Sequence, residues 1–119
     1  MTTTTAVRYG GRFVALERAL EAVEVATPVF EAVPPAHRDL AEQGSRSLTS
    51  VALNLAEGWG RRGRAKLHHY DVARGEADET TATLRILLAA RAGDPAAIAR
   101  AIALLDEVLA MTWRLLHPR

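Results

Sequence analysis

The side chains most able to do chemistry are a cluster of cations near the middle of the chain. Clustered cations neutralise phosphates, and each phosphate contact adds salt-dependent affinity for nucleic acid. This pattern therefore predicts a nucleic-acid-binding surface. The alternative is a solvated link or a charged contact between subunits, which a net charge of only +1 favours. The residues concerned are Arg61, Arg62, Arg64, Lys66 and Arg74.

A second group of polar residues comprises Asn54, Glu57 and Glu79. Asn54 and Glu57 are three positions apart and so share a face if this segment is helical. A carboxylate beside an apolar stripe needs a partner, because an unpaired buried charge is expensive. Arg46, or the free amides at the start of the next helix, would supply one. We expect a polar clasp between helices or subunits; the alternative is a general acid or base.

Cysteine chemistry, metal binding and catalysis find little support in the sequence. The chain has no cysteine, which excludes disulfides, thiolate catalysis and cysteine-based zinc sites. Metal sites in helical bundles use Glu-x-x-His pairs, and no glutamate here has a histidine three residues later. His68 and His69 are adjacent and should point to different helix faces. We expect no catalytic residue, metal or cofactor, and a protein that is not an enzyme.

The segment Gly58–Gly63 spells G-x-G-x-x-G, the spacing found in dinucleotide-binding loops. That motif works only between a strand and a helix of a parallel sheet. Here the preceding residues continue a helical stripe, and no other segment resembles a strand. We interpret the glycines as the end of one helix and a tight link to the next.

The elements that would position these residues are helices. The apolar fraction is 49% and consists mostly of alanine and leucine, the best helix formers, with few aromatic residues. No apolar run reaches the roughly 18 residues of a membrane span, and the threonine-rich start lacks the apolar core of a signal peptide. We therefore expect a cytoplasmic protein with no membrane partner.

Apolar residues recur every three or four positions in four segments, which predicts four helices. Short links between helices favour antiparallel neighbours. We therefore predict an all-α, antiparallel up-down four-helix bundle over residues 11–119, after a flexible tail over residues 1–10. The expected helices cover residues 11–33, 35–60, 64–92 and 95–117.

Proline and glycine mark the expected helix ends. Pro28 should kink the first helix or begin a fresh turn. Gly93 should close the third helix in a left-handed conformation, with Asp94 capping the fourth and Pro95 at its first position. The predicted core face of the first helix consists of Phe13, Leu16, Leu20, Val23, Thr27 and Phe30.

The last helix carries a second apolar stripe formed by Ile102, Leu109 and Leu116. A neighbouring subunit could cover this stripe, so we predict it as an oligomer interface. The alternative is a wide core face, since bundle helices often bury three positions per heptad.

The stretch 54-NLAEGWGRR-62 resembles the N-[IL]-A-E-G-[FW]-G-R signature of four-helix-bundle proteins encoded in 23S rRNA intervening sequences. Tyr70, Ala73, Gly75 and Glu79 are similar to a second stretch of that family. The chain departs from the family pattern where relatives usually carry Trp, Pro and Ser. Those positions are Leu16, Ala52 and Glu76.

The resemblance implies a compact bundle that assembles as a ring, typically a pentamer. One branch of the family is the accessory protein of diversity-generating retroelements, which works with a reverse transcriptase and binds nucleic acid. The partners implied are thus further copies of the chain, RNA or DNA, and a protein such as a reverse transcriptase.

We therefore expect a non-enzymatic oligomeric module that binds nucleic acid through the basic junction between the second and third helices. The alternative is a self-assembling, protein-binding adaptor with no affinity for nucleic acid. The cations lie off every apolar stripe, so their removal should preserve helicity and assembly. The four at the junction are Arg61, Arg62, Arg64 and Lys66.

Overall fold

The structure, a computed structural model, describes residues 13–118. The flexible tail expected over residues 1–10 lies outside this range. The described residues form four long helices and one short 3-10 helix, and they contain no strand. The elements are α1 (Val14–Glu31), η1 (Pro35–His37), α2 (Arg38–Trp59), α3 (Gly63–Ala89) and α4 (Pro95–Leu116).

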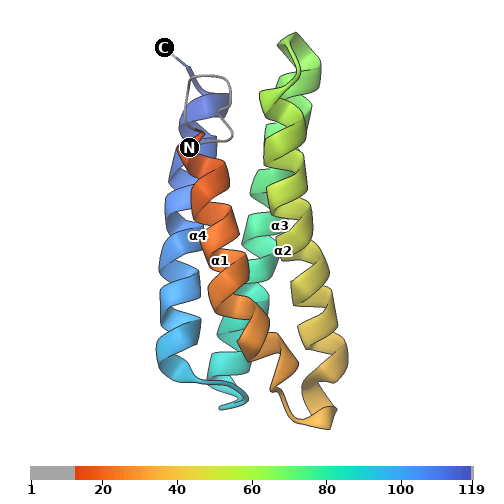
Figure 1. Ribbon diagram of the computed structural model, residues 1–119, viewed down its shortest axis with the longest axis vertical. Coiled ribbons are helices and arrows are strands. Elements are labelled where there is room, and N and C mark those ends of the chain that lie inside the picture. The colour runs from red at the N-terminus through yellow and green to blue at the C-terminus, as the bar shows by residue number, and fades with distance from the viewer. Residues whose placement is uncertain (1–12, 119) are drawn as a thin grey trace.

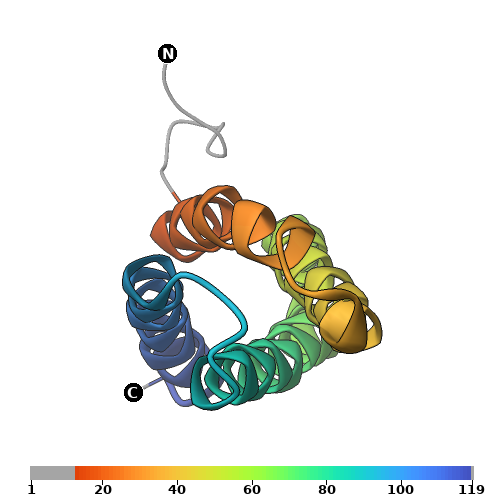
Figure 2. The ribbon, with the colours of Figure 1, turned by 90° about the horizontal axis from the view of Figure 1, so that it is seen from below.

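Consecutive helices run in opposite directions along the long axis of the molecule (Figure 1). Each helix packs against the helices before and after it, and α4 closes the arrangement by packing against α1. Viewed from below, the four helices surround a single central core (Figure 2). The predicted antiparallel up-down four-helix bundle is therefore confirmed.

Phe13 and Phe30, at the two ends of the predicted core face of α1, are buried as predicted, but the face differs between them. Its centre is a row of four fully buried alanines, whereas Leu20 is 53% exposed and Leu16 and Val23 are half-buried. The row of alanines and the row of larger apolar residues have the same spacing on this helix, and the prediction assigned the larger side chains to the core. The smaller ones face inward because they let α1 approach its neighbours closely. The buried alanines are Ala15, Ala19, Ala22 and Ala26.

Helices α2 and α3 approach each other closely in the middle of the bundle. A Cβ atom at Gly44 would lie 2.7 Å from Cγ2 of Thr83, so only glycine fits there. Beside it, the buried hydroxyls of Ser47 and Thr80 lie 2.7 Å apart and satisfy each other. Small and polar residues therefore set the register of these two helices.

The end of α3 differs from the expectation at Gly93. The left-handed residue is Arg91, with a φ of 56°, and Gly93 is not in that conformation. Position 93 favours glycine for another reason, which is close packing. A Cβ there would lie 3.0 Å from side-chain atoms of both Ile98 and Val29.

The start of α4 agrees with the prediction. Asp94 caps the helix by accepting a hydrogen bond of 3.2 Å from the amide of Ala96, and Pro95 is the first helical residue. Within α1, the helix continues through Pro28 as far as Glu31.

Candidate nucleic-acid interface

The link between α2 and α3 is only three residues long, which places the basic cluster at one end of the bundle. Gly63, the first residue of α3, has a φ of 58°, a conformation that favours glycine. The glycine motif is thus a helix end and a tight link. Arg61, Arg62 and Arg64 are exposed at this link, at the same end of the bundle as the C-terminal end of α4 (Figure 1).

Beneath the link lies a cluster of three aromatic rings. The rings of Phe13 and Trp59 are stacked with centroids 4.5 Å apart, and the ring of Tyr70 lies 5.8 Å from Phe13. A Cβ at Gly58 would be 2.6 Å from the Tyr70 ring, so glycine makes room for it. Burial raises the pKa of Tyr70. These aromatics are structural, because Tyr70 is only 2% exposed and Trp59 is half-buried.

Lys66 belongs to this aromatic cluster. Its Nζ atom lies 5.6 Å from the ring centroid of Trp59 and 5.5 Å from that of Tyr70, within the range of cation–π attraction. It also donates a hydrogen bond of 3.4 Å to the backbone oxygen of Trp59. The expectation that this lysine lies off every apolar stripe does not hold, since its ammonium group lies over the rings of Trp59 and Tyr70.

Arg61 has a carboxylate partner on the preceding helical turn. Its Nε donates to Oε2 of Glu57 over 2.8 Å. This hydrogen bond, together with the arginine charge, lowers the pKa of Glu57. Both side chains are exposed, and exposed pairs of this kind contribute little to stability. Arg61 therefore remains able to exchange this partner for a phosphate.

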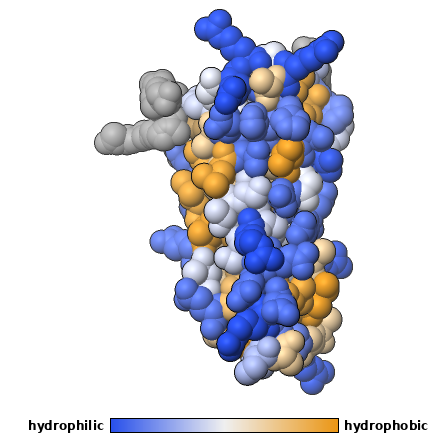
Figure 3. All heavy atoms as spheres, turned by 90° about the vertical axis from the view of Figure 1, so that its right-hand side faces the viewer, coloured by the Kyte–Doolittle hydropathy of each residue, from blue (hydrophilic) through white to orange (hydrophobic). Residues whose placement is uncertain are grey.

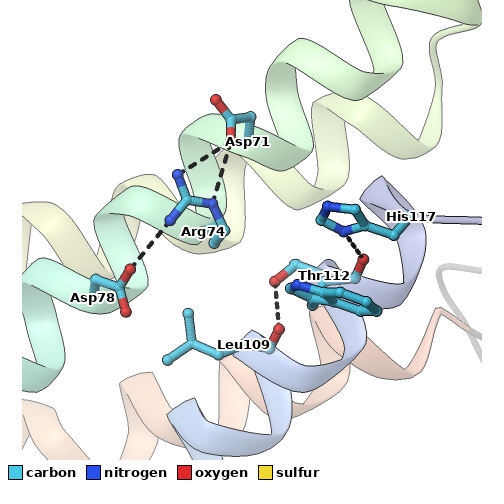
Figure 4. Close-up of polar contacts among 7 residues, drawn as sticks. Asp71, Arg74, Asp78, Leu109, Thr112 and His117 are labelled. Atoms are coloured by element: carbon cyan, nitrogen blue, oxygen red, sulfur yellow. Dashed lines mark hydrogen bonds and ion pairs between the residues drawn. The ribbon is translucent and has the colours of Figure 1, made fainter.

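Arg74 lies on a different part of the surface. It forms ion pairs with Asp71 at 3.2 Å and with Asp78 at 3.3 Å, on the side of α3 that faces Leu109 and Thr112 of α4 (Figure 4). Two carboxylates outweigh its single charge. The structure therefore separates Arg74 from the other predicted cations.

Arg62 and Arg64 differ from the other three predicted cations. Both are exposed, and neither side chain has a hydrogen bond or an ion pair among residues 13–118. Arg114, in the last turn of α4, is exposed and unpaired in the same way, and sequence reasoning did not single it out. In the described part of the chain, these three arginines are the cations at this end of the bundle whose side chains have no partner.

The residues of the predicted clasp lie in separate places. His69 of α3 donates from Nδ1 to Oδ1 of Asn54 over 2.9 Å, because the amide nitrogen of Asn54 is used in bonds to Ser50. Glu79 accepts a hydrogen bond of 3.2 Å from Gln43 of α2. Both contacts join α2 to α3.

The predicted clasp is thus two separate hydrogen bonds between α2 and α3 rather than one cluster. Gln43 and Asn54 are eleven residues apart, or roughly 16 Å along the helix. Glu57 takes part in neither of these two hydrogen bonds, since it pairs with Arg61, four residues further along the chain. The sequence did not reveal the partners Gln43 and His69, because neither lies on an apolar stripe.

The predicted oligomer stripe is half-buried. Ile102, Leu109 and Leu116 pack against the core of their own bundle. Apolar side chains that are more exposed than this stripe lie on other helices: Leu53 is 64% exposed on α2, and Leu20 is 53% exposed on α1.

Two kinds of site are absent from the described part of the chain. Within residues 13–118, no group of three or more acidic or histidine side chains could hold a metal ion. No helix in that range combines the length and apolar character needed to cross a membrane.

Comparison with known proteins gives one match. The model of a family described as 23S rRNA-intervening sequence protein matches residues 14–114. No curated protein matches the chain.

Proposed function

Because the chain belongs to the 23S rRNA-intervening sequence protein family, we propose that it is a non-catalytic, self-associating bundle that binds nucleic acid. The binding surface is the end of the bundle at the α2–α3 link. The observation that carries this proposal is the pair of exposed, unpaired arginines, Arg62 and Arg64, at that link.

The charges around the link support this surface. Arg61 is exposed next to Arg62 in the link. Arg114 is exposed in the last turn of α4, which lies at the same end of the bundle (Figure 1). Of the carboxylates nearby, Glu57 and Asp71 are already ion-paired with arginines. A phosphate backbone arriving at this end therefore meets a local excess of positive charge, although the whole chain is nearly neutral.

The absence of catalysis is supported by what the polar residues already do. The side chain of Asn54 is used in bonds to Ser50 and His69, and Glu79 is bonded to Gln43. Glu57 is exposed beside Arg61, which holds its pKa below the ordinary value, so it is a poor proton acceptor near neutral pH.

Self-association is supported by exposed apolar side chains along α1 and α2. The two helices pair with Phe13 beside Trp59 at one end and Phe30 beside Gly44 at the other, so Leu20 and Leu53 lie at similar heights. Apolar surface is visible at the left edge of the molecule and again at its lower right (Figure 3). We give the name outer α1–α2 face to a set of exposed or half-buried apolar side chains of these two helices, which comprises Leu16, Leu20, Val23, Ala52 and Leu53.

Repeated copies of the chain in a ring, with a pentamer favoured, would cover this face. In a ring, the arginine clusters of several subunits could contact one nucleic-acid strand at the same time. The affinity of the oligomer for that strand would then exceed the weak affinity of one subunit. The half-buried stripe of Ile102, Leu109 and Leu116 is the second candidate for the subunit contact.

The second candidate function is a protein-binding adaptor with no affinity for nucleic acid. The exposure of Leu20 and Leu53 favours it, since a partner protein such as a reverse transcriptase would cover the same apolar face. In that case the arginines at the link would be solvated and without a ligand.

Fluorescence anisotropy separates the two functions. Labelled single-stranded RNA and duplex DNA are titrated with the protein at about 50 mM and about 200 mM salt. Binding that weakens steeply with salt supports phosphate neutralisation. A folded protein that binds neither probe at the lower salt concentration supports the adaptor.

A further inference from the structure

The most exposed aromatic side chain among residues 13–118 is Trp113, on the last turns of α4. It is 56% exposed and stacks against His117, with ring centroids 4.1 Å apart and an angle of 21° between the planes. His117 is itself held in place, because its Nδ1 donates to the backbone oxygen of Trp113 over 2.8 Å. The indole is thus held by His117 on one face, while more than half of the residue remains open to solvent.

This indole lies at the basic end of the bundle. The C-terminal end of α4 and the α2–α3 link are at the same end of the molecule (Figure 1). Arg114, the next residue along the chain, is exposed and unpaired within residues 13–118, as are Arg62 and Arg64 at the link.

The part of α3 opposite this turn is not basic. In the close-up, His117 lies across from Asp71 and Arg74 (Figure 4). The arginine is bonded to both Asp71 and Asp78, so it does not add a free positive charge. A nucleic-acid strand would therefore reach the indole from the α2–α3 link and the end of α4, where the cations are unpaired.

We propose that Trp113 is a stacking platform for the bases of a single-stranded nucleic acid. The phosphates of the same strand are neutralised by Arg62, Arg64 and Arg114. This inference rests on the proposed function and narrows its ligand to single strands. A base of a single strand can expose its face to an indole, whereas the bases of a duplex are already stacked on each other.

Among residues 13–118, the other two large aromatic rings near the link are less accessible to a base. Trp59 is half-buried, with Phe13 stacked on its ring and Nζ of Lys66 over it, and the ring of Tyr70 is buried against Gly58. Trp113 also has one stacked neighbour, but its greater exposure suits a base.

The test compares probes that differ in bases but not in phosphates. The probes are a labelled oligo-dT of about 12 nucleotides, an abasic strand of equal length, and a duplex. The wild-type protein should bind the oligo-dT about tenfold more tightly than the abasic strand, the size of effect expected for stacking of one base. Trp113→Ala should bind the two strands equally, and Trp113→Phe should restore part of the preference.

A direct optical signal accompanies the titration. In Trp59→Phe protein, Trp113 is the remaining tryptophan of the chain. Its fluorescence should be quenched by the oligo-dT and much less by the abasic strand.

The outcomes separate this inference from the proposed function. Equal wild-type affinities for the oligo-dT and the abasic strand would overturn the stacking platform and leave phosphate binding intact. No binding of any probe would overturn both. A Trp113→Ala protein that keeps the oligo-dT preference but loses assembly would show that the indole is a subunit contact, which also overturns the inference.

Discussion

At the scale of single residues, the link region shows how one missing atom determines packing. Gly58 has no Cβ, and Tyr70 of α3 occupies the space that a Cβ would need. Gly58 is also the first glycine of the G-x-G-x-x-G sequence, which has the spacing of a dinucleotide-binding loop. The glycine therefore serves helix packing rather than the close approach of a dinucleotide phosphate.

Gly58→Ala should destabilise the protein by about 1–2 kcal/mol, because the clash with a buried ring exceeds the gain in helix propensity. Gly75→Ala is the matched control on α3. A Cβ there meets no atom within 4 Å, so this change should stabilise the protein by about 0.5–1 kcal/mol. Urea unfolding measures both values. A Gly58→Ala protein as stable as the wild type would contradict the packing described here.

Tyr70 should make stability fall at alkaline pH. Burial raises its pKa in the folded state above the unfolded value of about 10. The raised pKa means that the contribution of Tyr70 is complete below pH 10 and is lost as the pH rises through the folded-state value.

Urea midpoints between about pH 9 and pH 11.5 test this effect. The wild type should lose more stability over this range than Tyr70→Phe, which has no phenol to ionise. Every other ionisable group is common to the two proteins, so their difference isolates Tyr70. Identical pH dependence in the two proteins would contradict a buried, neutral Tyr70.

The roles of the individual cations could be predicted only in part. The sequence shows which residues are charged, and exposure of Arg61, Arg62 and Arg64 follows from their place in a link. It does not show that Lys66 reaches back over Trp59, or that Arg74 faces α4. Those partners are set by how three different helices pack, which no local pattern contains.

At the scale of elements, the helix limits were predictable and one helix face was not. The four segments agree with the structure to within a few residues, because prolines and glycines mark the ends. The middle of the inward face of α1 was predicted wrongly, whereas its ends, Phe13 and Phe30, were predicted correctly. Two rows with the same spacing competed, and the choice between Ala22 and Leu20 depends on how close the neighbouring helices come.

The cap of α4 gives a prediction at this scale. Asp94→Ala should cost about 1 kcal/mol, because the amide of Ala96 loses its acceptor and the helix dipole loses a negative charge. Asp106→Ala removes the same side chain from an exposed position inside α4, and it should be neutral or slightly stabilising. Thermal unfolding followed by circular dichroism compares the two. Equal losses would show that the cap is unimportant.

At the scale of the whole molecule, one side and one end of the bundle carry the surfaces proposed for function. The outer α1–α2 face exposes leucines, and the end at the α2–α3 link exposes arginines. The sequence indicated the second surface and placed the first on α4. Assembly and nucleic-acid binding should therefore respond to separate substitutions.

Leu20→Glu with Leu53→Glu should weaken self-association by at least about tenfold, because two apolar side chains lose their partner and two charges are buried. Both positions are exposed in the single bundle, so its stability should change little. Ile86→Glu, at a similarly exposed position on α3, is the control. Sedimentation equilibrium should give a mass near 12.9 kDa for the double variant. An unchanged assembly would place the subunit contact elsewhere.

The most direct test of the central claim is the affinity of Arg62→Ala/Arg64→Ala for labelled single-stranded RNA across a range of salt concentrations. Arg85→Ala/Arg100→Ala is the control, because it removes two arginines that are exposed and unpaired within residues 13–118 at other positions. Binding through the link predicts weaker affinity for the first variant, with its salt slope reduced by about one for each phosphate that is no longer neutralised. The control should resemble the wild type. Equal affinities and slopes for the two variants would contradict a nucleic-acid surface at the α2–α3 link.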